Sequence, residues 1–108
     1  MKPILRLAAG AAALAAALAG PAAHAHVPVC KCHLEGQKVI CQGGYDDDSR
    51  AVNTPIRVID YNEKVLVSGK LDARSRFVFD LPEGDFYILM DDGIGHTAEV
   101  ERVDIRGI

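Results

Sequence analysis

Apolar and polar residues alternate along most of the chain in short runs that turn-forming residues separate. This period of two is typical of β-strands with one buried face, and glycine, proline, asparagine and aspartate mark the turns. The pattern predicts strands on both sides of a turn at 36–37 within residues 29–42, and at residues 56–60, 65–71, 77–79, 86–90 and 97–105. No stretch after residue 25 has a convincing helical period. The expected fold is therefore an all-β sandwich of about seven strands.

The first 25 residues have the features of a secretory signal peptide. Lys2 and Arg6 give a positive start, residues 7–20 are apolar and uncharged, and residues 23–25 (AHA) supply the small-x-small pattern of a cleavage site. The apolar run is shorter and richer in alanine than the roughly 20 strongly apolar residues of a membrane helix. We expect cleavage after residue 25, a mature domain of residues 26–108 that does not insert in the membrane, and a periplasmic or secreted location.

The charge and the motifs of the mature domain exclude several classes of function. Without the leader, the domain has ten basic and fifteen acidic residues, a net charge of −5. Nucleic acids and anionic membranes need clustered positive charge, so neither is an expected partner. The sequence contains no phosphate-binding loop and no plausible set of nucleophile and base, and we expect that the protein is not an enzyme.

The cysteines predict one disulfide bond in the first hairpin. A two-residue turn at Gly36-Gln37, with glycine first, sets a register in which Cys32 lies opposite Cys41. This pair falls on a non-hydrogen-bonded position, where the two Cα atoms come closest and a disulfide is sterically reasonable. We therefore predict a Cys32–Cys41 disulfide, and Cys30 is left over.

The same segment also allows a second interpretation, a soft-metal site made of Cys30, Cys32, His33 and Cys41. Cys30 and Cys32 share one face of a strand, whereas His33 points to the other face. A single tetrahedral site with all four ligands would therefore need a bulge in the strand. The disulfide is the favoured interpretation of the two.

Beyond the hairpin, the order of landmarks resembles a known family. The stretch IRVIDYNEKVLVSGKLDARSRFVFDLPEGDFYILMDDG and the following IGHTAEVERVDI resemble the small periplasmic accessory component of nickel/cobalt uptake transporters of the energy-coupling-factor type. More broadly, they resemble prealbumin-like domains described as carboxypeptidase-regulatory-like. The resemblance covers essentially the whole mature chain, and it implies a prealbumin-like or immunoglobulin-like β-sandwich. Two positions depart from the family pattern: the first strand contains Cys-Lys-Cys-His, and the turn glycine expected near Ser75 is absent.

The narrower part of the resemblance is a histidine at the mature N-terminus together with the sequence DDGIGHTAE. It implies a bound Ni(II) or Co(II) ion and the subunits of a membrane transporter as partners. After cleavage, the α-amine and imidazole of His26 can chelate one ion, and imidazole and amine nitrogen suit nickel, cobalt, copper or zinc. His96 is the expected third ligand, with Glu99 or Asp91 as an oxygen ligand or a supporting group.

Other interpretations of the sequence stay open. Cleavage after Ala23 would leave His24-Ala25-His26, which can form a square-planar Cu(II) or Ni(II) site. The Cys-Lys-Cys-His segment could belong to a protein that handles copper or zinc. A metal-free module that docks on an envelope partner through its exposed sheet edges is the remaining alternative.

Overall fold

The computed structural model describes residues 27–108, which form seven strands and one short helical turn. The predicted leader and His26 lie outside the described residues. The strands are β1 (Pro28–Glu35), β2 (Lys38–Tyr45), β3 (Pro55–Ile59), β4 (Val65–Lys70), β5 (Arg76–Asp80), β6 (Tyr87–Asp91) and β7 (Thr97–Glu101). A 3₁₀-helix, η1 (Arg102–Asp104), follows β7. No helix within residues 27–108 is long and apolar enough to span a membrane.

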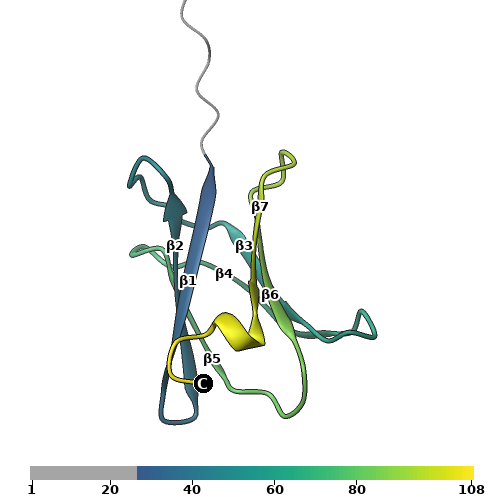
Figure 1. Ribbon diagram of the computed structural model, residues 1–108. Helices are drawn as coiled ribbons and strands as arrows, with labels where there is room; N and C mark the ends of the chain where they lie inside the picture. The colour runs from purple at the N-terminus through teal and green to yellow at the C-terminus, as the bar shows by residue number, and fades with distance from the viewer. Residues whose placement is uncertain (1–26) are drawn as a thin grey trace, which may run out of the picture.

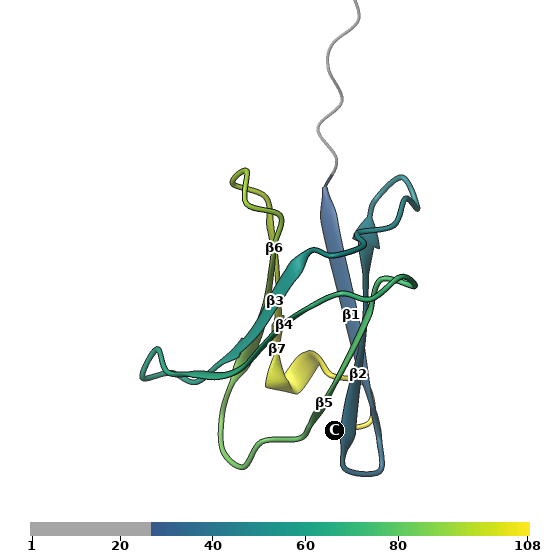
Figure 2. The ribbon, with the colours of Figure 1, turned by 180° about the vertical axis from the view of Figure 1, so that it is seen from behind.

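The seven strands form two antiparallel sheets that face one another, which confirms the predicted β-sandwich. One sheet has the order β1-β2-β5 and the other the order β4-β3-β6-β7 (Figure 1). The view from behind shows β4 and β5 on the side of the sandwich opposite to β1 and β7 (Figure 2). β1 and β7 are therefore edge strands of different sheets that border the same opening of the sandwich.

The core is built from the inward residues that the alternation predicts. Buried residues of both sheets, together with Phe86 from a loop, form one hydrophobic cluster whose fully buried members include Val39, Ile56, Val58, Ile88 and Met90. Cys32 and Cys41 belong to this cluster, and Cys30 packs against it. The sulfur atoms of the first hairpin thus lie on the core side of β1 and β2.

Two strand ends differ from the sequence-based prediction by more than one residue, those of β2 and β7. β2 continues beyond its predicted end at residue 42, through Gly43 and Gly44, to Tyr45. A Cβ atom at Gly43 would lie 2.4 Å from Leu71 Cδ1 and 2.8 Å from Met90 Sδ, so these two side chains occupy the space that the glycine leaves free. β7 ends at Glu101 rather than at residue 105. Beyond Glu101 the apolar residues no longer occupy the inward-facing positions of the strand, and the chain turns into η1.

The last residues of the chain cover part of the free edge of β1. Ile105 is buried, and Arg106 pairs with β1 in a parallel bridge opposite His33. The Arg106 N–H donates to Cys32 O (3.0 Å), and the Leu34 N–H donates to Arg106 O (2.9 Å). This bridge covers β1 from Cys32 onwards, and it leaves the edge at Cys30 without such a neighbour.

Candidate metal centre

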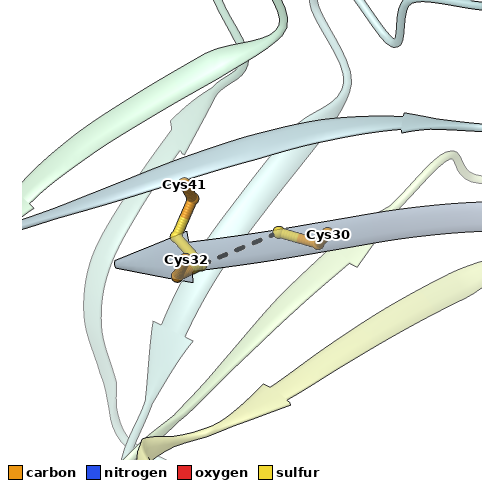
Figure 3. Close-up of side chains that lie close together, drawn as sticks. All are labelled: Cys30, Cys32 and Cys41. Atoms are coloured by element: carbon orange, nitrogen blue, oxygen red, sulfur yellow. Dashed lines mark hydrogen bonds between the residues drawn. A yellow bond between two sulfur atoms is a disulfide. The ribbon is translucent and has the colours of Figure 1, made fainter. Parts of the chain in front are cut away.

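The disulfide bond predicted from the hairpin register is present. Cys32 of β1 lies directly opposite Cys41 of β2, with a Cα–Cα distance of 4.1 Å, and their sulfur atoms are bonded (Figure 3). Gly36 has a φ of +59°, as the first residue of the predicted turn requires. The turn therefore sets the pairing of the hairpin, and the pairing brings the two cysteines together.

The third cysteine lies beside this disulfide. Cys30 and Cys32 are two residues apart on β1, so both side chains point to the same face of the strand. The Cys30 Sγ lies 3.9 Å from the Cys32 Sγ (Figure 3). The three sulfur atoms of Cys30, Cys32 and Cys41 all lie within 4.8 Å of one another. We call these three residues the sulfur cluster.

A groove between the facing edges of the two sheets leads to the sulfur cluster. Its volume is about 540 Å³, and Cys30 and Cys32 line it from β1 while Glu99 and Val100 line it from β7. Arg106 lines it where the C-terminal segment meets β1. The groove gives a small ion or reagent a route to a cluster whose third member, Cys41, is fully buried.

Burial controls the chemistry of the one free thiol among the described residues. Burial raises the pKa of the Cys30 thiol to about 11, because the apolar surroundings disfavour the thiolate. At neutral pH Cys30 is therefore a protonated thiol and a poor nucleophile toward the neighbouring disulfide. The Cys30 thiol can therefore lie next to the Cys32–Cys41 disulfide without rapid thiol–disulfide exchange.

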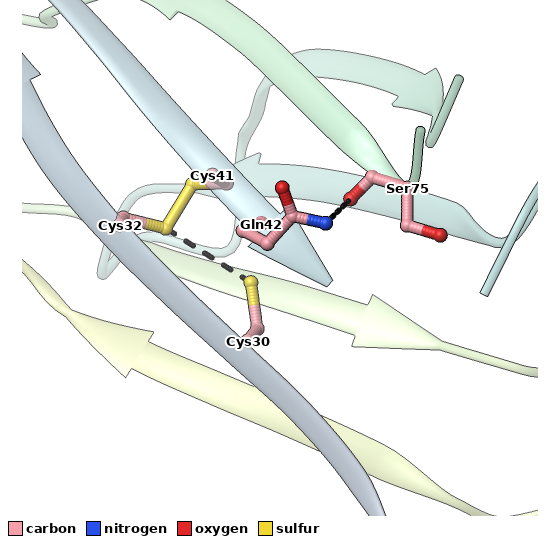
Figure 4. The surroundings of a disulfide bond; sticks show 5 residues. All are labelled: Cys30, Cys32, Cys41, Gln42 and Ser75. Atoms are coloured by element: carbon pink, nitrogen blue, oxygen red, sulfur yellow. Dashed lines mark hydrogen bonds between the residues drawn. A yellow bond between two sulfur atoms is a disulfide. The ribbon is translucent and has the colours of Figure 1, made fainter. Parts of the chain in front are cut away.

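The strand beside the cluster is fixed to the opposite edge of its own sheet. The Gln42 Nε2 donates to Arg74 O (2.9 Å) and to Ser75 O (3.4 Å), next to the disulfide (Figure 4). The Gly43 N–H also donates to Ser75 O (2.7 Å). These bonds hold β2 in place on the side away from β1.

His33 does not join the sulfur cluster. It lies on the outer face of β1, where its Nε2 is 3.2 Å from Glu35 Oε1. This placement agrees with strand parity, since His33 is one residue away from Cys32. The arrangement that required Cys30, Cys32, His33 and Cys41 around one ion is therefore not formed.

His96 lies in the loop between β6 and β7 and is bound to Asp92. Its Nδ1 is 3.2 Å from Asp92 Oδ2, and the Asp92 side chain is only 8% exposed. Burial alone would raise the pKa of Asp92, but the backbone N–H groups of Ile94 and His96 and the adjacent imidazole lower it. Asp92, rather than the predicted Asp91, is the carboxylate that holds the His96 ring.

The other two predicted oxygen ligands lie in different surroundings. Asp91 accepts a hydrogen bond from the Gly93 N–H (2.8 Å) and stabilises the loop. Glu99 lines the groove beside Cys30. Among residues 27–108, the sulfur cluster is the group of three or more metal-ligating side chains within 4.8 Å of one another, and it contains none of His96, Asp91 and Glu99. The predicted site that also includes His26 stays a prediction, because His26 lies outside the described residues.

The sequence did not predict that Met90 would lie near the sulfur cluster. Gly43 lies opposite Cys30 in the β1–β2 register, and a Cβ atom there would be 2.8 Å from the Sδ of Met90. The sulfur of Met90, which is fully buried on β6, therefore lies over the cross-strand partner of Cys30. No local sequence pattern links Met90 to the hairpin, since only the packing of the two sheets brings them together.

Comparison with models of protein families, with curated proteins and with solved structures found no match to this chain. The function of this protein is therefore inferred from the site itself.

Proposed function

We propose that the protein is an exported metal-binding protein and that the sulfur cluster, once reduced, is its metal site. The observation that carries the proposal is the convergence of three cysteine sulfur atoms within 4.8 Å of one another. Thiolate sulfur is the preferred ligand of soft transition-metal ions. A disulfide in the resting protein fits an oxidising compartment such as the periplasm.

The spacing of the sulfur atoms supports this proposal. A metal–sulfur bond of about 2.3 Å places two ligand sulfurs about 3.8–4.0 Å apart in a tetrahedral or trigonal site. The distance between the Cys30 and Cys32 sulfur atoms is 3.9 Å. Cys30 and Cys32 therefore already have the separation of two ligands of one ion, and Cys41 becomes a third thiol when the disulfide is reduced.

The test is metal titration of the mature domain after anaerobic reduction with a phosphine that is then removed. We expect one ion per chain, sulfur-to-metal charge-transfer absorption with Co(II), and protection of all three thiols from a thiol reagent. Cys30→Ser should weaken binding at least about tenfold. His33→Asn is the matched control, because its side chain faces away from the cluster, and it should leave binding unchanged. Equal affinity of wild type and Cys30→Ser would contradict the proposal.

A second candidate is the function implied by the family resemblance, in which Ni(II) or Co(II) is bound at the N-terminus and passed to a membrane transporter. The start of β1, which follows His26 in the chain, lies at the same end of the sandwich as the loop between β6 and β7 (Figure 1). His96 is in that loop, with a half-exposed ring oriented by Asp92. Metal-binding histidines are commonly oriented by a carboxylate in this way.

The N-terminal candidate can be separated from the sulfur cluster by one added residue. Mass spectrometry first establishes whether the mature protein begins at His26. An extra alanine before His26 should then weaken Ni(II) binding at least about tenfold, because the α-amine and imidazole no longer belong to one residue. Binding through the sulfur cluster would not change. Undiminished Ni(II) affinity in the extended protein would exclude the N-terminal site.

A further inference from the structure

A fourth sulfur atom, that of Met90 on the opposite sheet, packs over Gly43, the cross-strand partner of Cys30. Cys30 and Gly43 are directly opposed on β1 and β2, and side chains of such a pair have Cβ atoms about 4.5–5.5 Å apart on the same face. Gly43 has no side chain, and the Met90 Sδ lies 2.8 Å from the point that its Cβ would occupy. The space over Gly43 is therefore shared by the Met90 thioether and the Leu71 side chain, whose Cδ1 is 2.4 Å from the same point.

Among the described residues, the metal-ligating side chains that lie within 4.8 Å of one another are all cysteines, whereas Glu99 and His33 line the groove outside this group. His33 is on the outer face of β1, paired with Glu35, and the inward side chains of this part of the hairpin are Cys30, Cys32 and Cys41. Thiolate sulfur binds Zn(II) as well as Cu(I), so the thioether is the ligand that favours Cu(I) over Zn(II). Ni(II) and Co(II) bind imidazole and amine nitrogen more commonly than a thioether. Cu(I) is also satisfied by three sulfur ligands with a weak fourth one.

We infer that the sulfur cluster binds monovalent copper, that Met90 contributes the fourth sulfur, and that the Cys32–Cys41 disulfide decides whether the site is open. This inference rests on the proposed function of the cluster. With the disulfide formed, two of the three cysteines are not thiolates and cannot act as full ligands.

The opening of the site is a two-electron exchange with a dithiol. The disulfide takes two electrons and two protons from the dithiol, whose own sulfur atoms become a disulfide, and Cys32 and Cys41 become thiols. One Cu(I) ion then forms bonds to Cys30, Cys32 and Cys41, and the three thiol protons leave to solvent. A disulfide-bearing oxidant reverses the exchange: it takes two electrons from the Cys32 and Cys41 thiolates and two protons from solvent to become a dithiol, Cys32 and Cys41 are bonded again, and the ion loses two ligands. The groove beside Cys30 and Cys32 is the route by which the ion enters and leaves.

The experiment is an anaerobic competition for Cu(I) against a chromogenic Cu(I) chelator, with oxidised and reduced mature protein. The variants are Met90→Leu and the exchange variant Leu71→Met/Met90→Leu. Leu71 also contacts the space over Gly43, with its Cδ1 at 2.4 Å from the same Cβ point, so the exchange keeps the core volume and returns a thioether to that space. Zn(II) affinity of the same proteins is the control for general damage to the fold.

We expect reduced wild-type protein to bind one Cu(I) and the oxidised protein to bind at least about a hundredfold more weakly. Met90→Leu should weaken Cu(I) binding about tenfold with little change for Zn(II), and the exchange variant should recover most of the loss. If reduction unfolds the apo chain, circular dichroism gives the same information, because one equivalent of Cu(I) should restore the sheet signal more effectively in wild type than in Met90→Leu.

Each outcome that contradicts the inference overturns a different part of it. Equal Cu(I) affinity of wild type and Met90→Leu would overturn the assignment of Met90. Equal affinity of oxidised and reduced protein would overturn the role of the disulfide. Failure of the reduced protein to bind any metal through its thiols would overturn the proposed function of the cluster itself.

Discussion

Single residues in two turns explain why a serine occupies a position whose backbone conformation favours glycine. Asp60 and Asp72 each accept hydrogen bonds from the backbone N–H groups two and four residues later. The third residue after each aspartate has a positive φ, 65° at Glu63 and 59° at Ser75. Glycine is favoured in this conformation, but the fully buried Ser75 Oγ accepts a hydrogen bond from the Ala51 N–H at 2.8 Å. Serine is suited to this position because its hydroxyl satisfies a buried backbone donor.

Replacing these two residues by glycine should therefore have opposite effects. Glu63→Gly should raise the free energy of unfolding by up to about 1 kcal/mol, since Glu63 is exposed and its left-handed conformation is strained. Ser75→Gly relieves the same strain but leaves the Ala51 N–H without its acceptor, so we expect a net loss of about 1–2 kcal/mol. Urea denaturation of both variants tests this contrast. Stabilisation by Ser75→Gly would show that the buried hydrogen bond contributes little.

The reactivity of Cys30 is a second property of a single residue. With its pKa raised to about 11, the thiol in the folded protein should react with iodoacetamide at pH 8 about a hundredfold more slowly than in the urea-unfolded, disulfide-intact chain. The folded rate should rise about tenfold per pH unit until about pH 11. Since the folded pKa is raised, this thiol stabilises the fold below pH 9 and loses that contribution as the pH rises toward 11. A rate that levels off near pH 9 would contradict the effect of burial.

At the scale of secondary structure, the first hairpin was the most predictable element. The turn at Gly36 sets the register, and the register alone places Cys32 opposite Cys41. The ends of β2 and β7 could not be predicted in the same way. Glycines 43 and 44 are typical of a turn, yet they continue a strand because residues of the other sheet need the space over Gly43. The turn can be predicted from the local sequence, whereas the ends of β2 and β7 depend on packing between the sheets.

The disulfide should stabilise this hairpin, and hence the domain, by restricting the unfolded chain. It closes a loop with a sequence separation of nine residues. Loop-closure entropy predicts that Cys32→Ala/Cys41→Ala lowers the free energy of unfolding by about 2–3 kcal/mol, in addition to lost packing in the core. Cys30→Ala is the control, since it leaves the disulfide intact, and it should cost less. A double variant as stable as wild type in urea would show that the disulfide is not a structural bond.

At the scale of the whole molecule, the position of the sulfur cluster follows from how the two sheets meet. The cluster lies where edge strands β1 and β7 border a groove, and the bridge of Arg106 to β1 leaves the edge at Cys30 open. The grouping of the cysteines could be predicted from strand parity and register within one hairpin. The groove, the outward position of His33 at its rim, and the approach of Met90 depend on contacts between segments that are distant in the sequence.

The most direct test of the metal-binding account is X-ray absorption spectroscopy of the reduced, mature protein loaded with one equivalent of Cu(I). The account predicts a metal surrounded by sulfur alone, with three ligands at about 2.3 Å and a longer, weaker one that Met90→Leu removes. Nitrogen or oxygen ligands in place of sulfur would contradict it. They would direct attention to His96 and to the predicted N-terminal ligand His26.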